Sequence, residues 1–135
     1  MTDFRRVTDT LSVSPQITPD DVALAKAQGF TAIINNRPDG EAEGQPISAE
    51  IEAAARAIGL GYTHIPVRGG PTPEQVEQNR AALEAAGGPV LAFCRTGTRS
   101  IVTWSVGEAQ AGRDRGELVR LGADAGYDLS GVLGT

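Results

Sequence analysis

The chain has 135 residues, 40% of them hydrophobic and 21% charged, and its net charge is −5. This length suits one compact domain over residues 1–135 with a real core. The acidic balance argues against nucleic-acid binding, and no apolar run reaches membrane-spanning length. The start, Met1–Arg6, has no apolar signal core, so we expect a cytoplasmic protein without membrane partners.

The chain contains a single cysteine, Cys94, and a single histidine, His64. One cysteine excludes an internal disulfide and a cysteine-based metal site, and one histidine disfavours zinc. We therefore expect no metal and no organic cofactor. In a reducing cytoplasm the lone thiol can stay free.

The first half of the chain alternates strands and helices. Two short strands are predicted at 5–10 and 11–14. Thr18 caps a helix that has Pro19 at its first position and runs to about Gln28. The apolar run 30–35 predicts a buried strand, and a polar loop over 36–47 follows. Ser48 then caps a second helix that ends near residue 58.

The second half continues the alternation. A strand is predicted at 61–67, and Thr72 caps a helix whose Gln75 completes a capping box. A strand at 89–93 precedes the loop 94–99, and helices follow at about 100–111 and 115–125. This order predicts an α/β fold: a mainly parallel central sheet of four to five strands, flanked by helices on both faces.

Three loops follow the carboxyl ends of predicted strands, which gather at one edge of such a sheet. These loops bring several arginines toward that edge of an otherwise acidic protein: Arg37, Arg68, Arg95 and Arg99. We expect an anion site there. Arg37 and Arg68 are substrate-side cations or belong to a structural network with Asp39 and Glu41, and the sequence leaves both readings open.

The stretch FCRTGTRS (93–100) places Cys94 between a buried strand and a helix. Backbone N–H groups of such a loop can point inward and cradle an anion, and Gly97 permits the tight turn. The loop residues are Arg95, Thr96, Gly97 and Thr98. The helix N-terminus and nearby cations favour the thiolate, and Arg99 offers a planar fork for an oxyanion.

Two further residues of this region keep alternative interpretations. The Ser100 hydroxyl hydrogen-bonds the sulfur or caps the helix, and both roles fit. Cys94 could instead be a buried cysteine with a purely structural role. The combination of strand end, glycine, second arginine and helix start argues against this alternative.

Several segments resemble one bacterial family: LSVSPQIT, TAIINNRPDGE, YTHIPVRGG, GPVLAFCRTGTRS and AGYDLSGV. The family is the phosphatase-like domain sometimes fused to a beta-lactamase-hydrolase-like (persulfide dioxygenase) domain. The resemblance implies the fold of tyrosine and dual-specificity phosphatases. It also implies that Cys94 is a nucleophile and Arg99 an oxyanion clamp, and that a persulfide dioxygenase is a functional partner.

Two features depart from the phosphatase pattern. Four residues separate Cys94 from Arg99, where tyrosine phosphatases have five and rhodanese-type sulfurtransferases four. Dual-specificity phosphatases also commonly place an aspartic acid just after the strand that ends here in HIPV, whereas this chain has Arg68-Gly69-Gly70. The nearest substitutes are Asp39 and Glu41. Asp39 is a candidate general acid, and it is equally explained as a turn residue before a glycine.

Two other residues are weighed and set aside. His64 lies within a predicted strand and is interpreted as structural. Trp104 follows the cysteine loop by about one helical turn and is interpreted as core.

Three functions remain at the level of the sequence. The preferred one is a sulfurtransferase that carries sulfane sulfur as a Cys94 persulfide and acts on a small anionic or persulfide substrate. The alternative is a phosphatase that forms a cysteinyl-phosphate from a phosphorylated substrate. A non-catalytic anion-binding module is the third, and the intact pair of Cys94 and Arg99 makes it less favoured.

Overall fold

The computed structural model describes residues 3–134; the ends of the predicted domain, residues 1–2 and 135, lie outside the described residues. Strands and helices alternate along most of the chain, as predicted. The elements are β1 (Arg5–Arg6), β2 (Leu11–Ser14), α1 (Pro19–Ala27), β3 (Ala32–Asn35), α2 (Ser48–Ala57), β4 (Gly61–His64), α3 (Pro73–Ala85), β5 (Val90–Phe93), α4 (Thr98–Gln110), α5 (Arg115–Asp124) and α6 (Ser130–Leu133).

The five strands form one sheet in the order β1-β2-β5-β3-β4. The pairs β2–β5, β5–β3 and β3–β4 are parallel, and only the two-residue β1 runs antiparallel, against β2. The predicted α/β class and mainly parallel sheet are therefore confirmed. β5 pairs along both of its edges, so the strand that leads into Cys94 is the middle of the sheet.

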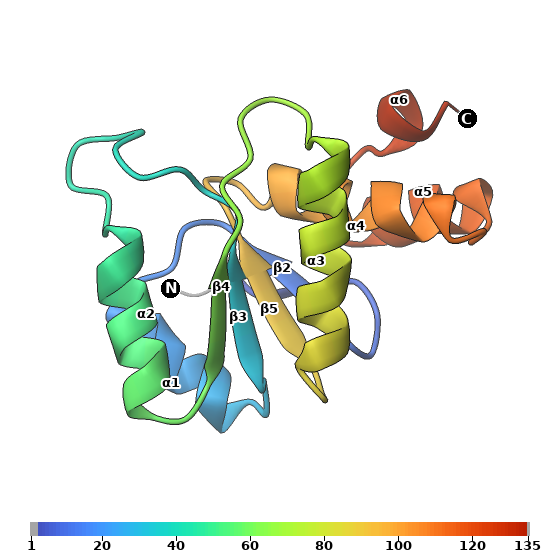
Figure 1. Cartoon of the computed structure of the whole chain (residues 1–135). Helices are drawn as coiled ribbons and strands as arrows, with labels where there is room; N and C mark the ends of the chain where they lie inside the picture. Colours follow the sequence, from blue (N-terminus) through green and yellow to red (C-terminus); the bar gives the residue numbers. More distant parts are fainter. Residues whose placement is uncertain (1–2, 135) are drawn as a thin grey trace.

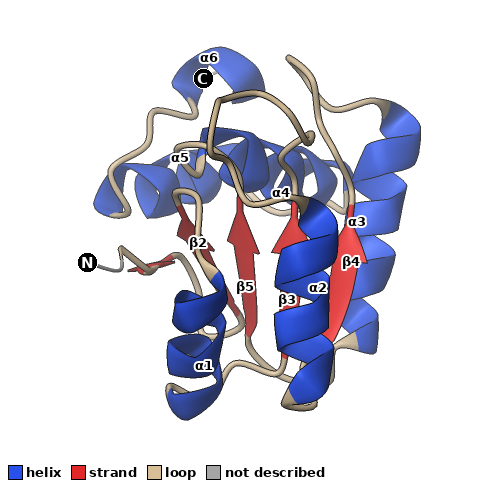
Figure 2. Cartoon of the chain, turned by 90° about the vertical axis from the view of Figure 1, so that its left-hand side faces the viewer, coloured by secondary structure: helices blue, strands red, loops and turns tan. Residues whose placement is uncertain are grey.

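Helices cover both faces of the sheet (Figures 1 and 2). On one face, α1 and α2 pack against alternate residues of the central strands, among them Ile33, Leu91 and Phe93. On the other, α3, α4 and the C-terminal helices pack against Ile34, Ala92 and their neighbours. The strand residues alternate between the two cores because successive side chains of a strand point to opposite faces.

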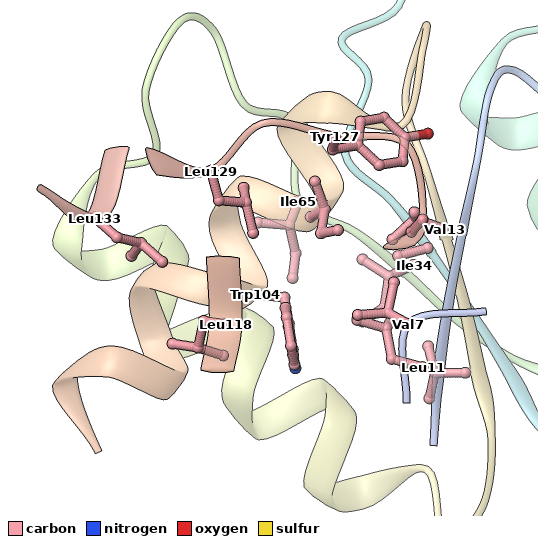
Figure 3. Packing of buried hydrophobic residues seen from close by; sticks show 14 of the residues in the cluster. Val7, Leu11, Val13, Ile34, Ile65, Trp104, Leu118, Tyr127, Leu129 and Leu133 are labelled. Atoms are coloured by element: carbon pink, nitrogen blue, oxygen red, sulfur yellow. The ribbon is translucent and has the colours of Figure 1, made fainter. Parts of the chain in front are cut away.

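The second core gathers residues that lie far apart in the sequence (Figure 3). Trp104 of α4 packs at its centre and is 5% exposed, which confirms its interpretation as core. Residues beyond α5 close this core from the C-terminal side, namely Tyr127, Leu129 and Leu133. The C-terminal segment is thus an integral part of the packing.

Most helix starts agree with the sequence. Thr18 and Thr72 both form capping boxes, with Asp21 and Gln75 respectively. The start of α2 differs, because its N-cap residue is Ile47 and Ser48 is already helical. α4 starts at Thr98, two residues before the predicted start, so Arg99 and Ser100 lie in its first turn. The short helix α6 was not predicted.

The loops that follow β3, β4 and β5 all leave the sheet at its carboxyl end, which is the upper end in Figure 1. The register places Ser14 and Asn35 on either side of Phe93. Cys94, the next residue, therefore emerges between the ends of β2 and β3. This confirms the predicted placement of the arginine-bearing loops at one edge of the sheet.

Candidate active site

Cys94 directly follows β5 and is fully buried. Its backbone N–H donates to the Ser14 carbonyl at 3.4 Å, and the Gln16 N–H donates to the Arg95 carbonyl at 3.3 Å. The chain after β2 therefore holds the beginning of the cysteine loop by main-chain hydrogen bonds. A loop held in this way keeps its own N–H groups in fixed directions.

The middle of the loop turns at Gly97, whose φ of 91° lies in the left-handed region that favours glycine. Its backbone N–H donates to the Sγ of Cys94 at 3.1 Å. α4 begins one residue later, so the positive end of its dipole also lies beside the thiol. The sequence predicted both features from the strand–loop–helix order, and the role of the thiolate as a nucleophile stays a prediction.

Arg99 lies in the first turn of α4 and is held by three hydrogen bonds. Its Nη1 donates to a Glu41 carboxylate oxygen at 2.8 Å and to the Val67 carbonyl at 2.9 Å. Its Nη2 donates to the other Glu41 oxygen at 2.8 Å. No oxygen atom among residues 3–134 accepts the Nε–H or the second Nη2–H of Arg99. This edge of the guanidinium is the fork that can bind two oxygens of one anion, and the Cys94 sulfur lies close enough to interact with Arg99.

The carboxylate of Glu41 joins Arg99 to a second arginine. The Nε of Arg37 donates to it at 2.9 Å, and the Nη1 of Arg37 donates to the Gln16 side chain at 3.0 Å. The pKa of Glu41 falls from 4.5 to about 2, mainly through the hydrogen bond from Arg99 and less through Arg37, against a rise from partial burial. The pKa of Arg99 is raised in turn, first by Glu41 and also by the nearby Cys94.

Arg37 is only 4% exposed and belongs to this network. Of the two readings that the sequence left open for Arg37, the geometry therefore favours the structural one. The His64 Nε2 lies 2.8 Å from the Arg37 carbonyl, which can only accept, so Nε2 carries the proton. His64 thus holds the backbone of Arg37, in agreement with its structural interpretation.

Asp39 does not join this network. Its Oδ1 accepts the backbone N–H of Ser48 at 2.8 Å, which caps the first turn of α2. The Ser48 hydroxyl lies 2.6 Å from that of Tyr62. The predicted Ser48 cap is thus replaced by a carboxylate from the preceding loop. The geometry gives Asp39 a capping contact, while its catalytic role stays a prediction.

The remaining predicted residues occupy different environments. Ser100 is 1% exposed, and its hydroxyl has no hydrogen-bond partner among residues 3–134, so neither the sulfur bond nor the cap predicted for it is formed. The Thr96 hydroxyl donates to that of Thr98 at 3.0 Å on the exposed side of the loop. Arg68 and Arg95 are exposed, and their roles toward a substrate stay predictions.

Sequence reasoning missed two residues that contact the loop region. Gln16 binds Arg37, and the Tyr127 hydroxyl donates to the Thr96 carbonyl at 2.8 Å. Both lie within segments that carry the family resemblance, SPQIT and AGYDLSGV. That resemblance was the only signal for them, because neither contact follows from local sequence pattern.

The described residues hold no group of three or more metal-binding side chains. Nor is any helix among residues 3–134 both long and apolar enough to span a membrane. A hollow of about 440 Å³ lined by Leu11, Gly88 and Trp104 lies at the amino end of β2 and β5, away from the cysteine loop. It therefore belongs to the opposite end of the sheet from this site.

The sequence of this chain is similar to one part of several longer known proteins. The family profile described as "Beta-lactamase hydrolase-like protein, phosphatase-like domain" matches residues 3–111. The beta-lactamase hydrolase-like protein of Agrobacterium fabrum is 38% identical over 92% of the chain, and that of Xylella fastidiosa 35% over 91%. The chain spans only 29% of the length of either relative.

Solved structures show the same fold. A provisionally named phosphatase from Neisseria meningitidis has a TM-score of 0.88 and 34% identity, over 99% of this chain and 96% of that one. Tk-PTP in its active form has a TM-score of 0.70 at 20% identity, over 93% and 86%. The architecture is thus that of the tyrosine phosphatases, as the resemblance implied.

Proposed function

The chain belongs to the family of the phosphatase-like domain of beta-lactamase hydrolase-like proteins, and from this premise we propose that it is a cysteine-dependent phosphatase. One observation carries the proposal. The buried Sγ of Cys94 accepts the Gly97 N–H at 3.1 Å, and it lies close to Arg99, whose Nε–H and second Nη2–H bind no oxygen among residues 3–134. In this arrangement the Cys94 thiolate and the guanidinium of Arg99 can act on the same bound phosphoryl group.

The first chemical step forms a bond between the Cys94 sulfur and phosphorus. The bond from phosphorus to the ester oxygen breaks, and its electron pair leaves with that oxygen. The loop N–H groups and the free edge of Arg99 stabilise the charge on the phosphoryl oxygens during this transfer. In the second step water attacks phosphorus, the sulfur leaves as thiolate, and inorganic phosphate departs.

The ester oxygen can leave only if it receives a proton or if the leaving group is stable as an anion. Glu41 is a poor acid, since its pKa of about 2 keeps it ionised near neutrality. Asp39 caps α2, and the chain after HIPV has no carboxylate in Arg68-Gly69-Gly70. We therefore propose aryl phosphates as the substrate class, because a phenolate leaves with less help than an alkoxide does.

Sulfur transfer remains a second candidate because of one observation. The loop places four residues between Cys94 and Arg99, and this shorter loop suits a persulfide better than a phosphoryl group. The comparisons favour the phosphatase, which is the reverse of the preference drawn from the loop length and from the missing carboxylate after HIPV. The partner implied by the resemblance, a persulfide dioxygenase, stays a prediction.

The test compares both reactions in the same purified protein. Release of phosphate from a series of aryl phosphates with different leaving groups is measured beside sulfur transfer from thiosulfate and from glutathione persulfide. Cys94→Ser serves as the control, and its thermal unfolding shows that it is folded. We expect phosphate release that depends steeply on the leaving group and is lost in Cys94→Ser.

Two outcomes would contradict the proposal. Fast sulfur transfer without phosphate release would replace it with the second candidate. Activity retained by Cys94→Ser would remove the thiolate from either reaction.

A further inference from the structure

Tyr127 lies in the C-terminal segment between α5 and α6, beyond the residues that the family profile matches. Its backbone N–H donates to the Gly122 carbonyl at 2.8 Å, and its ring packs in the core beside α4. The Arg5 guanidinium lies 5.1 Å from the ring centroid and also donates to the Ala125 carbonyl at 3.3 Å. The ring is therefore held from several sides, and Figure 3 shows its oxygen directed away from the apolar cluster.

The Tyr127 hydroxyl and the Cys94 sulfur contact the same peptide unit from opposite sides. The hydroxyl donates to the Thr96 carbonyl at 2.8 Å. The N–H of that peptide belongs to Gly97 and donates to the Sγ of Cys94 at 3.1 Å. The C=O and N–H of a trans peptide point in opposite directions, so a bond that fixes the carbonyl also directs the N–H at the sulfur.

The packing at this peptide leaves no spare room. A Cβ added at Gly97 would lie 2.2 Å from the Tyr127 oxygen and 3.0 Å from the ring carbon that carries it. A peptide unit next to a glycine can rotate more easily than others, because glycine tolerates both negative and positive φ. In the orientation observed here, the Tyr127 hydroxyl binds the Thr96 carbonyl of this peptide.

We propose that Tyr127 is a positioning residue of the cysteine loop, which holds the Thr96–Gly97 peptide so that its N–H points at the Cys94 thiolate. This inference rests on the proposed function only in taking that thiolate as the reacting group, and it applies equally to phosphoryl and sulfur transfer. The bond to the carbonyl also polarises the peptide, which strengthens the N–H as a donor to the sulfur.

The charged groups around this pair are few. Arg5, itself paired with Asp3, faces the Tyr127 ring, and Arg99 interacts with the Cys94 sulfur. Burial raises the pKa of Tyr127, so its hydroxyl keeps its proton and donates across the neutral range. Replacement of the hydroxyl by hydrogen therefore removes a hydrogen bond without changing any charge near the thiolate at neutral pH.

The test uses Tyr127→Phe, with Tyr62→Phe as a matched control. Tyr62 is the only other tyrosine of the chain and is similarly buried, at 8% exposure against 9%. Its hydroxyl bonds to Ser48 and Asn35 rather than to the cysteine loop. The ionisation of Cys94 is followed by the ultraviolet absorbance of the thiolate as a function of pH, with the same variants in a Cys94→Ser background as blanks.

For Tyr127→Phe we expect the midpoint of thiolate formation to move up by about half a pH unit to one unit, a threefold to tenfold change in the ionisation constant. The kcat/KM below that midpoint falls by a similar factor. For Tyr62→Phe we expect an unchanged midpoint, although thermal unfolding shows a loss of stability. The absorbance titration needs no turnover, so it tests Tyr127 even if neither proposed reaction is found.

Two results would overturn the proposal. One is a Tyr127→Phe variant whose midpoint and kcat/KM both match those of the unaltered protein. The other is an equal shift in both variants, because a general loosening of the fold would then explain the effect.

Discussion

Replacement of Glu41 by glutamine tests how Arg99 is held. The substitution keeps the size of the side chain but removes the charge that accepts two hydrogen bonds from Arg99 and one from Arg37. The amide nitrogen of glutamine is a donor and faces a guanidinium that also only donates. At least one of the three bonds is therefore lost, and Arg99 becomes free to turn.

The magnitude follows from the ionisation of Glu41. A pKa lowered from 4.5 to about 2 corresponds to roughly 3 kcal/mol of stabilisation above pH 4.5, at 1.36 kcal/mol per unit. The side chain is 25% exposed, so solvent screens part of this, and we expect Glu41→Gln to lower the free energy of unfolding by about 1–2 kcal/mol at pH 7.

The pH dependence has a definite sign. A carboxylate with a lowered pKa stabilises the fold above its ordinary pKa of 4.5 and loses that contribution as the pH falls toward 2. The difference between Glu41→Gln and the unaltered protein is therefore largest at neutral pH. At pH 3 less than about half of it remains. Urea unfolding at pH 7, 4 and 3 measures this difference directly.

The same variant separates two effects on catalysis. Loss of a negative charge beside the site makes inorganic phosphate bind about twofold to fivefold tighter as an inhibitor. When Glu41 no longer fixes Arg99, the Nε–H and Nη2–H edge of Arg99 is no longer held toward the phosphoryl group, and we expect kcat for an aryl phosphate to fall by about tenfold. An unchanged kcat would refute the reasoning, since Glu41 would then have no part in orienting Arg99. Equal unfolding free energies at pH 7 would refute the estimate of stability.

Three other changes have distinct expected results. Asp39→Asn keeps the Oδ1 acceptor of the cap but removes a negative charge at the N-terminus of α2, so the free energy of unfolding should fall by about 0.3–1 kcal/mol while kcat/KM for an aryl phosphate stays within about twofold; a much larger loss of kcat would restore Asp39 as an acid. Gly97→Ala places a methyl group 2.2 Å from the Tyr127 oxygen at a φ of 91°, so we expect loss of activity with about 1–3 kcal/mol of destabilisation by urea unfolding. Phe93→Ala empties a fully buried site beneath the loop, and calorimetry should show a loss of about 3–5 kcal/mol.

Much of the fold could be predicted because its signals are local. Capping residues with proline at the first helical position located α1 and α3, and short apolar runs located β3 and β5. The boundaries that failed depend on contacts from elsewhere. The N-cap residue of α2 is Ile47, whose side chain cannot accept a hydrogen bond, and the carboxylate of Asp39 in the preceding loop caps this helix.

The candidate site was predicted only in part for the same reason. The alternation of strands and helices places Cys94 and Arg99 at the carboxyl edge of the sheet, and a short motif is enough to name both residues. Their partners lie far along the chain: Glu41 is 58 residues from Arg99, and Tyr127 is 31 residues from Thr96. No local pattern selects Glu41 over Asp39 as the carboxylate that meets the arginine.

The sequence by itself determined the order of elements, the parallel sheet and the loop that carries the thiol, because turn chemistry and apolar spacing act over a few residues. Only the tertiary structure decided which carboxylate orients Arg99, which one caps a helix, and which hydroxyl holds the Thr96–Gly97 peptide. These choices depend on where distant loops and the C-terminal segment come to lie once the two cores have packed. The contacts that hold Arg99 and the cysteine loop therefore come from side chains that the motif of Cys94 does not contain.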